Sequence, residues 1–270
     1  MMVFPKTASP VPLSDYERRQ VQAIAAWKGE KPGVMSSVIS RVASSASKLT
    51  DAVLPDAPIE KVLVLINQAA AHINQDDSIL KDKRLEALGI SSIDQLSAQS
   101  LEFVDELADR CITEAGHMAA GMGAATSAGG PISVALGIPT LLFGALRLIH
   151  RVSGCYGNTF TPEQEPGVMM GVLSIALAST PEQRAHAMAG YRQRIETSFI
   201  HAAMEESANK ALQRVVLGQE IGAMVPGFNI ALNAYLNRQL IIRTGTATKR
   251  IFQEQWLRDK GKVGSIAPAS

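Results

Sequence analysis

The sequence predicts an all-α fold, and three observations support this prediction. Apolar residues recur at intervals of three and four along most of the chain, which is the spacing of one face of an α-helix. Helix-start signals, in which Ser or Thr precedes Glu or Gln by three residues, introduce several of these stretches. No stretch shows the turn-bounded alternation of apolar and polar residues that marks a half-buried strand. We therefore expect a multi-helix single domain around a central Gly-rich apolar helical hairpin.

Composition excludes several classes of protein. Of the 270 residues, 46% are hydrophobic and 19% are charged, so the chain can bury a full core. With 26 basic and 25 acidic side chains, overall charge favours no polyanion, and we expect no nucleic-acid partner. Cys111 and Cys155 provide neither a disulfide framework nor a metal-binding spacing, which suggests a reducing compartment. We read no secretory signal at the N-terminus and expect residues 1–13 to be flexible.

The first half of the chain contains five expected helices. Ser14 and Glu17 have capping-box spacing, so a helix begins there, and Gly29 with the following Pro and Gly residues ends it. Apolar stripes predict helices over 35–53 and 59–73, a short charged helix over 80–88, and a longer one over 93–114. In the longer helix, the residues expected inside are Leu96, Leu101, Val104, Leu107 and Ile112, and those expected mostly outside are Glu102, Asp105, Glu106 and Asp109.

Between Glu114 and Arg147 lie 32 consecutive residues without a charged side chain. A bilayer crossing needs only about 20, but glycines crowd the first half of this segment, and its clearly apolar part, 132–146, contains Gly137 and Pro139. Two short apolar helices with a break at Gly-Gly-Pro fit better, and they form a hairpin over 115–153. Three interpretations stay open: a hairpin buried in the core, a hairpin that lies against or enters lipid, and a permanent transmembrane span.

Two further helix starts occur in the second half of the chain. Thr161 and Thr180 are each followed by Pro and, three residues on, by Gln. The helix after Thr180 is expected to run to about Leu217, and a last helix from near Pro226 to Lys260. The uncharged windows 166–181 and 221–237 are expected to belong to the core. Residues 261–270 are expected to be disordered, which leaves one domain over 14–260.

The run GAATSAGGPISVALGIPTLLFGALRLIHRVSGCYG, from Gly123 to Gly157, resembles the signature of the EcsC family. It has a small-residue segment, an Ile-Pro turn, a Leu-Arg-x-Ile helix and a Tyr-Gly pair. Other segments are similar to the family pattern in the same order: the Tyr16-Glu17 helix ending at Trp27, the Lys210 helix, and the block Ile221-Gly222, Pro226-Gly227 and Asn229 to Asn233 leading to Phe252 and Trp256-Leu257. The resemblance covers most of residues 14–260.

The resemblance implies a bacterial, hydrophobic and mostly helical protein. The family takes its name from a bacterial gene cluster that also encodes an ATP-binding-cassette transporter, and it implies no set of catalytic residues. This sequence departs from the family pattern at Gly137, where relatives often have an acidic residue before Ile-Pro, and at Asn158-Thr159, where an acidic position is common. If those acids serve a metal or a proton, this chain has lost them.

The candidate ligand-binding residues are Arg147, His150, Tyr156, Asn229 and Asn233. Arg147 interrupts an apolar helix, where an unpaired charge is costly. With His150 and Arg151 it forms a basic cluster that suits a phosphate or a lipid headgroup, or else it pairs with an acid on another helix. Asn229 and Asn233, four positions apart, either hydrogen-bond across helices or line a pocket.

Recognisable catalytic and metal-binding motifs are absent from the sequence. Glu114 and His117 form a single Glu-x-x-His pair, whereas a di-metal site needs two such pairs and further carboxylates, so we expect no metal. Cys155 lies near His150 and is either a nucleophile or a small buried apolar residue. The sequence contains no H-E-x-x-H, G-x-S-x-G or Walker A motif, and we expect no cofactor.

The first functional hypothesis is a non-enzymatic protein that associates peripherally with membrane lipid, or with a membrane-protein partner, through the apolar hairpin. It would be cytoplasmic, at the inner face of the cell membrane, with contacts through Ile132, Leu136, Leu141, Leu142 and Phe143. One alternative is an enzyme acting on a lipid-like or phosphorylated substrate near Arg147, His150 and Tyr156. The other is a soluble helical scaffold. A pocket joining those three residues favours the enzyme, exposure of 132–142 favours the membrane, and burial of both favours the scaffold.

Overall fold

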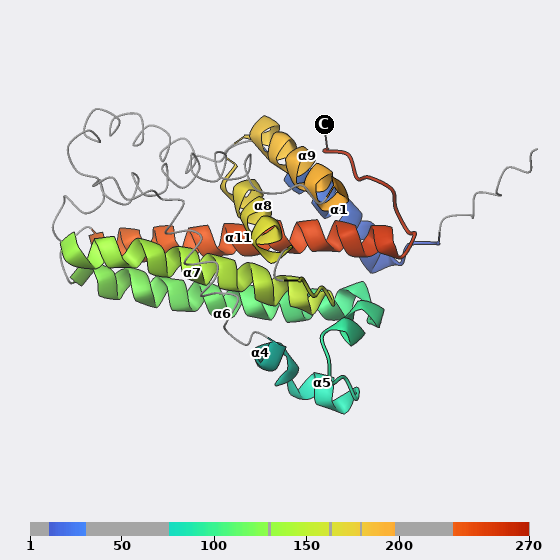
Figure 1. Cartoon of the computed structure of the whole chain (residues 1–270), viewed down its shortest axis with the longest axis horizontal. Helices are drawn as coiled ribbons and strands as arrows, with labels where there is room; N and C mark the ends of the chain where they lie inside the picture. Colours follow the sequence, from blue (N-terminus) through green and yellow to red (C-terminus); the bar gives the residue numbers. More distant parts are fainter. Residues whose placement is uncertain are drawn as a thin grey trace, which may run out of the picture.

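Helices make up every regular element that the computed structural model describes (Figure 1). The described residues are 11–30, 76–128, 131–161, 164–178, 180–197 and 229–269, and within them the side chains of 76–77, 122–140, 142, 166, 193–197, 229–234 and 236 are not described. The predicted all-α fold class is therefore confirmed. The predicted helices over 35–53 and 59–73, and the part of the Thr180 helix beyond residue 197, lie outside the described residues.

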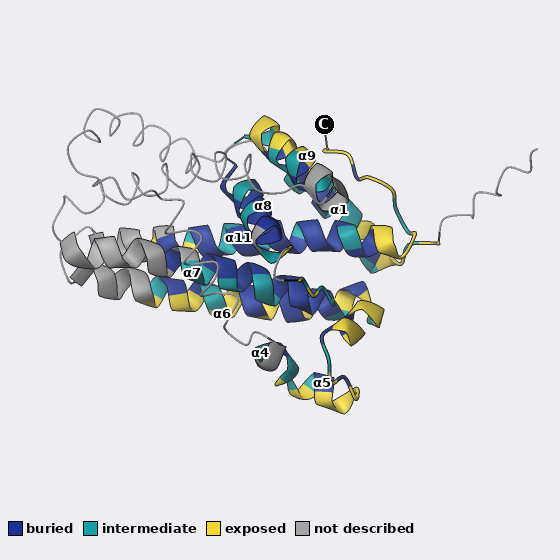
Figure 2. Ribbon diagram, in the orientation of Figure 1, coloured by how far each residue is buried: buried dark blue, intermediate teal, exposed yellow. Residues whose placement is uncertain are grey.

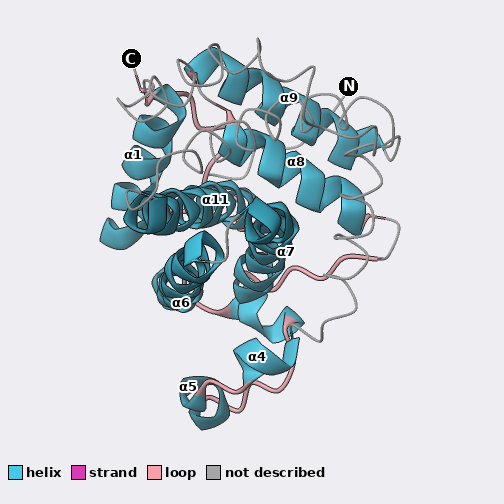
Figure 3. Ribbon diagram, turned by 90° about the vertical axis from the view of Figure 1, so that its left-hand side faces the viewer, coloured by secondary structure: helices cyan, strands magenta, loops and turns pink. Residues whose placement is uncertain are grey.

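Three long helices lie side by side at the centre of the fold: α6 (Leu101–Ala128), α7 (Pro131–Cys155) and α11 (Asn229–Asp259) (Figures 1 and 3). They meet at Gly245 of α11, where an added Cβ would lie 2.6 Å from Cγ1 of Ile112 on α6 and 3.1 Å from Cδ2 of Leu148 on α7. Only a residue without a side chain allows this approach. Figure 2 colours much of the described length of these helices as buried. Their large buried side chains include Leu101, Leu146, Leu148, Ile149 and Phe252.

The central hairpin breaks where the sequence predicts. Helix α6 ends at Ala128 and α7 begins at Pro131, so the break falls at the Gly-Gly-Pro run. The two helices are much longer than the short ones expected, with 28 and 25 residues. The uncharged segment of α6 continues the amphipathic helix that contains Glu114, and the uncharged segment of α7 runs directly into the part of the helix that contains Arg147. Internal glycines allow this, because each costs a helix only about 1 kcal/mol.

Helix α1 (Asp15–Gly29) begins with the predicted capping box. The Glu17 amide donates to Ser14 Oγ at 3.1 Å, and the Ser14 amide donates back to Glu17 Oε2 at 2.8 Å. The helix ends at Gly29, as expected, and buries Ile24. It packs near α11, α6 and α9.

Two helices lie with α1 on one side of α11: α8 (Glu165–Leu177) and α9 (Pro181–Thr197) (Figure 3). Helix α9 starts as Thr180 predicts, because Thr180 Oγ1 accepts from the Gln183 amide at 3.2 Å. Helix α8 begins at Glu165, later than Thr161 predicts, because a turn comes first in which the Gln164 amide donates to Thr161 O. Its uncharged sequence is buried nearly all round, as predicted for this window: Val168, Met169, Val172, Leu173 and Ile175.

The segment before α6 forms short elements: α4 (Asp76–Leu80), α5 (Lys83–Ala87) and the 3₁₀ helix η2 (Asp94–Ala98). Helix α5 falls inside the predicted charged helix 80–88. The predicted helix 93–114 is divided, because the chain leaves helical geometry at Gln99 before α6 starts. The five residues expected inside this region are all buried: Leu96, Leu101, Val104, Leu107 and Ile112.

The C-terminal segment differs from the prediction of a disordered tail. Residues 262–269 leave α11 as an extended strip along α1, with the Ala269 amide donating to Ala25 O at 2.8 Å. Ile266 is buried, and its carbonyl accepts from Lys28 Nζ at 2.6 Å. The strip is ordered because one apolar side chain and several backbone groups find partners on α1 and α11, which its Gly-, Pro- and Ser-rich composition does not reveal.

Candidate functional site

The candidate ligand-binding residues predicted from the sequence have different neighbours in the structure. The imidazole of His150 on α7 contacts the carboxylate of Glu165 at the start of α8, and Arg147, one turn earlier, is half-buried. Tyr156, just after α7, is buried, and its hydroxyl donates to Asp105 Oδ1 on α6 at 2.5 Å. Asn229 and Asn233 occupy the first turns of α11, and their side chains lie outside the described residues.

Asp105 accepts hydrogen bonds from side chains in three other parts of the chain. Besides Tyr156, the hydroxyl of Tyr16 on α1 and the amide Nε2 of Gln253 on α11 both donate to Asp105 Oδ2 at 2.6 Å. The carboxylate has no exposed surface. We call Asp105, Tyr16, Tyr156 and Gln253 the Asp105 centre; Gln20 extends it, because its Oε1 accepts from Gln253 at 3.2 Å.

Burial dominates the electrostatics of the Asp105 centre. It raises the pKa of Asp105, although the charge of Lys249 and the three donors act in the opposite direction. Burial and then the neighbouring carboxylate raise the pKa of both Tyr16 and Tyr156, so both remain protonated donors at neutral pH. Because protein donors occupy both carboxylate oxygens and no surface is exposed, this arrangement favours joining four elements over acid–base catalysis on a substrate.

The prediction that Asp105 lies mostly outside is therefore wrong. Asp105 lies four residues after Leu101 and three before Ala108, which are both fully buried, so it occupies the core-facing stripe of α6. This spacing was visible in the sequence. The partners were not, because they lie 89, 51 and 148 positions away along the chain.

Acids from neighbouring helices contact two members of the predicted basic cluster on α7, His150 and Arg151. Glu165 contacts His150, and Glu114 Oε2 lies 3.0 Å from a guanidinium nitrogen of Arg151. Glu114 is thus engaged across the hairpin, while His117 is exposed. In the part of the chain that the structure describes, no three His, Cys, Asp or Glu side chains come together as a metal site would require.

The C-terminal part of α6 and the N-terminal parts of α7 and α11 lie together and carry no charged residue. We call residues 115–128 of α6, 131–146 of α7 and 229–237 of α11 the charge-free end; it lies at the left of Figure 1. Of its described side chains, Met118 is 57% exposed and Tyr235 43% exposed, and open space surrounds Gly121.

The predicted contact residues differ in their placement at the charge-free end. Leu141 is only 3% exposed and belongs to the core, and Phe143 is half-buried. The side chains of Ile132, Leu136 and Leu142 lie outside the described residues. No helix in the described ranges is both long and apolar enough to traverse a bilayer.

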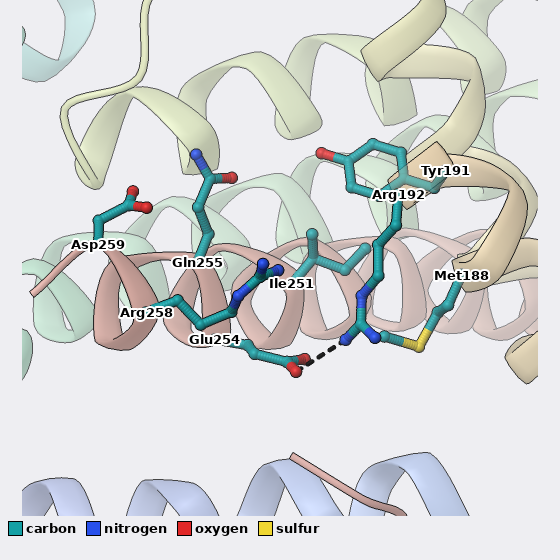
Figure 4. Close-up of a pocket in the computed structure, with 8 residues that line it drawn as sticks. All are labelled: Met188, Tyr191, Arg192, Ile251, Glu254, Gln255, Arg258 and Asp259. Atoms are coloured by element: carbon teal, nitrogen blue, oxygen red, sulfur yellow. Dashed lines mark hydrogen bonds and ion pairs between the residues drawn. The ribbon is translucent and has the colours of Figure 1, made fainter. Parts of the chain in front are cut away.

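A pocket of about 210 Å³ lies between α9 and the C-terminal half of α11 (Figure 4). Ile251, Met188 and the ring of Tyr191 supply its apolar surface, and Arg192 pairs with Glu254 at 2.7 Å along one side. Two arginines and two carboxylates line it, so its charge selects neither an anion nor a cation. The remaining lining residues are Gln255, Arg258 and Asp259.

The comparisons with known proteins identify a family. The sequence model described as the EcsC protein family matches residues 18–257. This match includes the Asp105 centre except Tyr16, and the whole charge-free end. No curated protein matches the chain, and no solved structure matches it.

Proposed function

The chain belongs to the EcsC protein family, and we propose that it is a non-enzymatic member that associates peripherally with an anionic membrane surface through its charge-free end. The observation that carries this proposal is that three adjacent helices present uncharged ends on the same side of the molecule (Figure 1). The site of action would be the cytoplasmic, inner face of the cell membrane.

Exposed apolar side chains support a contact at this end. Four large hydrophobic side chains stand out as exposed in the described residues, and two of them, Met118 and Tyr235, belong to the charge-free end. Leu141 lies in the core, so the proposed contact does not use it. A tyrosine suits the boundary between lipid and water, because its ring is apolar and its hydroxyl is polar.

The lengths of the charge-free helices favour insertion at the surface over a crossing. At 1.5 Å per residue, the uncharged parts of α6 and α7 extend about 20 to 25 Å, whereas the hydrocarbon core of a bilayer is about 30 Å thick. A hairpin of this length enters one leaflet and the headgroup region. We therefore propose shallow, reversible association.

Charges at the border favour anionic lipid. On α7 the first charged residue beyond the uncharged part is Arg147, and on α11 it is the exposed Arg238. On α6 it is Glu114, whose carboxylate already pairs with Arg151. Arg238 is exposed at this border, and an arginine near an anionic surface contributes about 1 kcal/mol to binding.

Flotation of the purified full chain with lipid vesicles tests the proposal. We expect the protein to float with phosphatidylglycerol-containing vesicles, less with pure phosphatidylcholine, and less again at high salt, because salt screens the arginine contribution. If the folded protein stays in the soluble fraction with every lipid, direct lipid binding is excluded, and a membrane-protein partner or a soluble scaffold is the better interpretation.

Matched variants locate the contact. Met118→Asp combined with Tyr235→Asp should abolish flotation, whereas Leu88→Asp, at a 55% exposed leucine outside the charge-free end, should float like wild type. Arg238→Glu should weaken binding to anionic vesicles only, and Arg258→Glu, at an exposed arginine near the other end of α11, should not. Equal effects of the test and control variants would contradict this placement of the surface.

A further inference from the structure

The tertiary structure brings the two cysteines of the chain into contact. Cys111 on α6 and Cys155 at the last residue of α7 are 44 positions apart, yet their Sγ atoms lie 3.9 Å apart. Both are free thiols. A disulfide needs an S–S distance of about 2.0 Å, so an approach of about 2 Å separates this pair from a covalent bond. Cys155 ends its helix, where fewer backbone bonds oppose such a movement.

The environments of the two thiols differ in a way that assigns roles. The hydrogen bond with Cys155 lowers the pKa of Cys111, and the Arg151 guanidinium acts in the same direction against burial. The same hydrogen bond, together with burial, raises the pKa of Cys155. Cys111 also retains 6% exposure, whereas Cys155 has none. Because Cys111 keeps the larger exposure and the Cys155 thiol donates to Arg151 O at 3.2 Å inside the core, Cys111 suits first attack and Cys155 suits the second step.

Arg151 is positioned to stabilise a thiolate. Its guanidinium reaches Glu114 at 3.0 Å, while its Nε is buried and has no hydrogen-bond acceptor among the described residues. A negative charge on Cys111 interacts favourably with Arg151. A positive charge favours the thiolate, which is the form of a cysteine that peroxide attacks.

We propose that Cys111 and Cys155 form a redox-active dithiol, which hydrogen peroxide converts to a disulfide that joins α6 to α7. The Cys111 thiolate attacks one peroxide oxygen, the O–O bond breaks, and hydroxide leaves and takes up a proton, so Cys111 becomes a sulfenic acid. Cys155 Sγ then attacks that sulfur and loses its proton, and the sulfenic oxygen departs as a second water. Two thiols are thereby oxidised and one peroxide is reduced to two waters.

The disulfide would close the base of the hairpin. Residues 112–154 lie between the two cysteines and include the uncharged parts of α6 and α7. Tyr156, next to Cys155, donates to Asp105, so the bond would form beside the Asp105 centre. A cross-link over a loop of this length stabilises a fold, in the chain-entropy account, by restricting the unfolded chain. A reducing compartment would make the bond transient and reversible.

Thiol counting on the folded full chain tests the proposal. After treatment with hydrogen peroxide we expect both thiols to disappear together, with a monomeric product that has lost the mass of two hydrogen atoms and is restored by dithiothreitol. The thermal midpoint of this product should exceed that of the reduced protein. The proposal would be overturned if both thiols remained under peroxide that oxidises glutathione completely. It would also be overturned if thiols were lost only in covalent dimers.

Single substitutions separate the two roles. In Cys155→Ser, oxidation should stop at a Cys111 sulfenic acid that dimedone traps, and in Cys111→Ser, Cys155 should react at least tenfold more slowly than the wild-type pair. Circular dichroism before oxidation shows whether each variant is folded. Arg151→Gln should slow the first step severalfold, whereas Arg19→Gln, at an exposed arginine, should not. Equal rates in Cys111→Ser and wild type would contradict the assignment of Cys111.

Discussion

Asp105 is a fully buried carboxylate on the core-facing side of α6. A buried carboxylate is costly unless hydrogen bonds compensate, and here two tyrosines and a glutamine supply them. Each donor comes from a different part of the chain, so the network sets the positions of α1 and α11 and of the segment after α7 relative to α6. Its value is specificity of packing more than net stability.

The raised pKa of Asp105 predicts a pH dependence of stability. The folded state holds its proton to a higher pH than the unfolded chain, whose ordinary pKa is 3.8, so the contribution to stability is present at low pH and is lost as pH rises through the folded pKa. Relative to Asp105→Asn, wild type should therefore lose free energy of unfolding as pH rises above about 4. Urea unfolding at a series of pH values measures this difference.

An exposed carboxylate provides the control for this pH dependence. Asp94→Asn, which makes the same substitution at an exposed position outside the Asp105 centre, is the matched control. Glu17 contributes in the opposite direction: burial alone would raise its pKa, but Lys262 and Ser14 outweigh burial and lower it. That contribution is common to wild type and Asp105→Asn and cancels in the difference. Parallel pH profiles of stability for wild type and Asp105→Asn would contradict the raised pKa of Asp105.

At the scale of elements, glycine decides how closely the central helices pack. Gly245 lies against Ile112 of α6, and Gly116 of α6 lies against Ile242 of α11, so each helix offers a small residue to a branched side chain of the other. Gly121 of α6 has open space around it instead. The same residue type therefore has a packing role at two positions and none at the third.

This contrast predicts opposite effects of alanine on stability. Gly245→Ala should destabilise the protein by about 1 to 3 kcal/mol, because the new methyl group would lie within 3 Å of two carbon atoms of Ile112 that cannot easily move. Gly121→Ala should be neutral or should stabilise by up to about 1 kcal/mol, because alanine is the better helix former. Urea unfolding of both variants checks the prediction; a loss of stability in Gly121→Ala as large as in Gly245→Ala would disprove it.

At the scale of the whole molecule, Glu254 joins parts that are distant in sequence. Its buried carboxylate lies 2.6 Å from Lys28 Nζ of α1 and 2.7 Å from Arg192 of α9, and it accepts from the Ile266 amide of the C-terminal strip at 3.1 Å. Burial lowers the pKa of Lys28, against the pull of Glu254. The ion pair thus holds α1, α9 and the strip on one side of α11.

Breaking this pair should destabilise the entire fold. Glu254→Gln leaves the Lys28 ammonium buried without its carboxylate, which costs about 3 to 5 kcal/mol for a buried ion pair. Adding Lys28→Met should recover part of this loss, because the orphaned charge is removed. A double-mutant cycle from urea unfolding gives the coupling energy between the two residues. A coupling energy near zero would refute the role assigned to the pair.

The sequence by itself determined the helical class and several boundaries. The Ser14–Glu17 capping box, the start of α9 at Thr180 and the break at Gly-Gly-Pro depend on residues a few positions apart, so local rules suffice for them. The absence of charge over 115–146 likewise belongs to the sequence alone. The order of the family's motifs could also be read without coordinates.

Only the tertiary structure decided which distant residues meet. Asp105 finds Tyr16, Tyr156 and Gln253, and Cys111 finds Cys155, because helices that are far apart in the chain pack with one relative rotation and register. The C-terminal strip becomes ordered for the same reason, since Ile266 gains its partners only on the assembled α1 and α11. Periodicity indicates which face of a helix is buried, but the partner of that face depends on the packing of the whole chain.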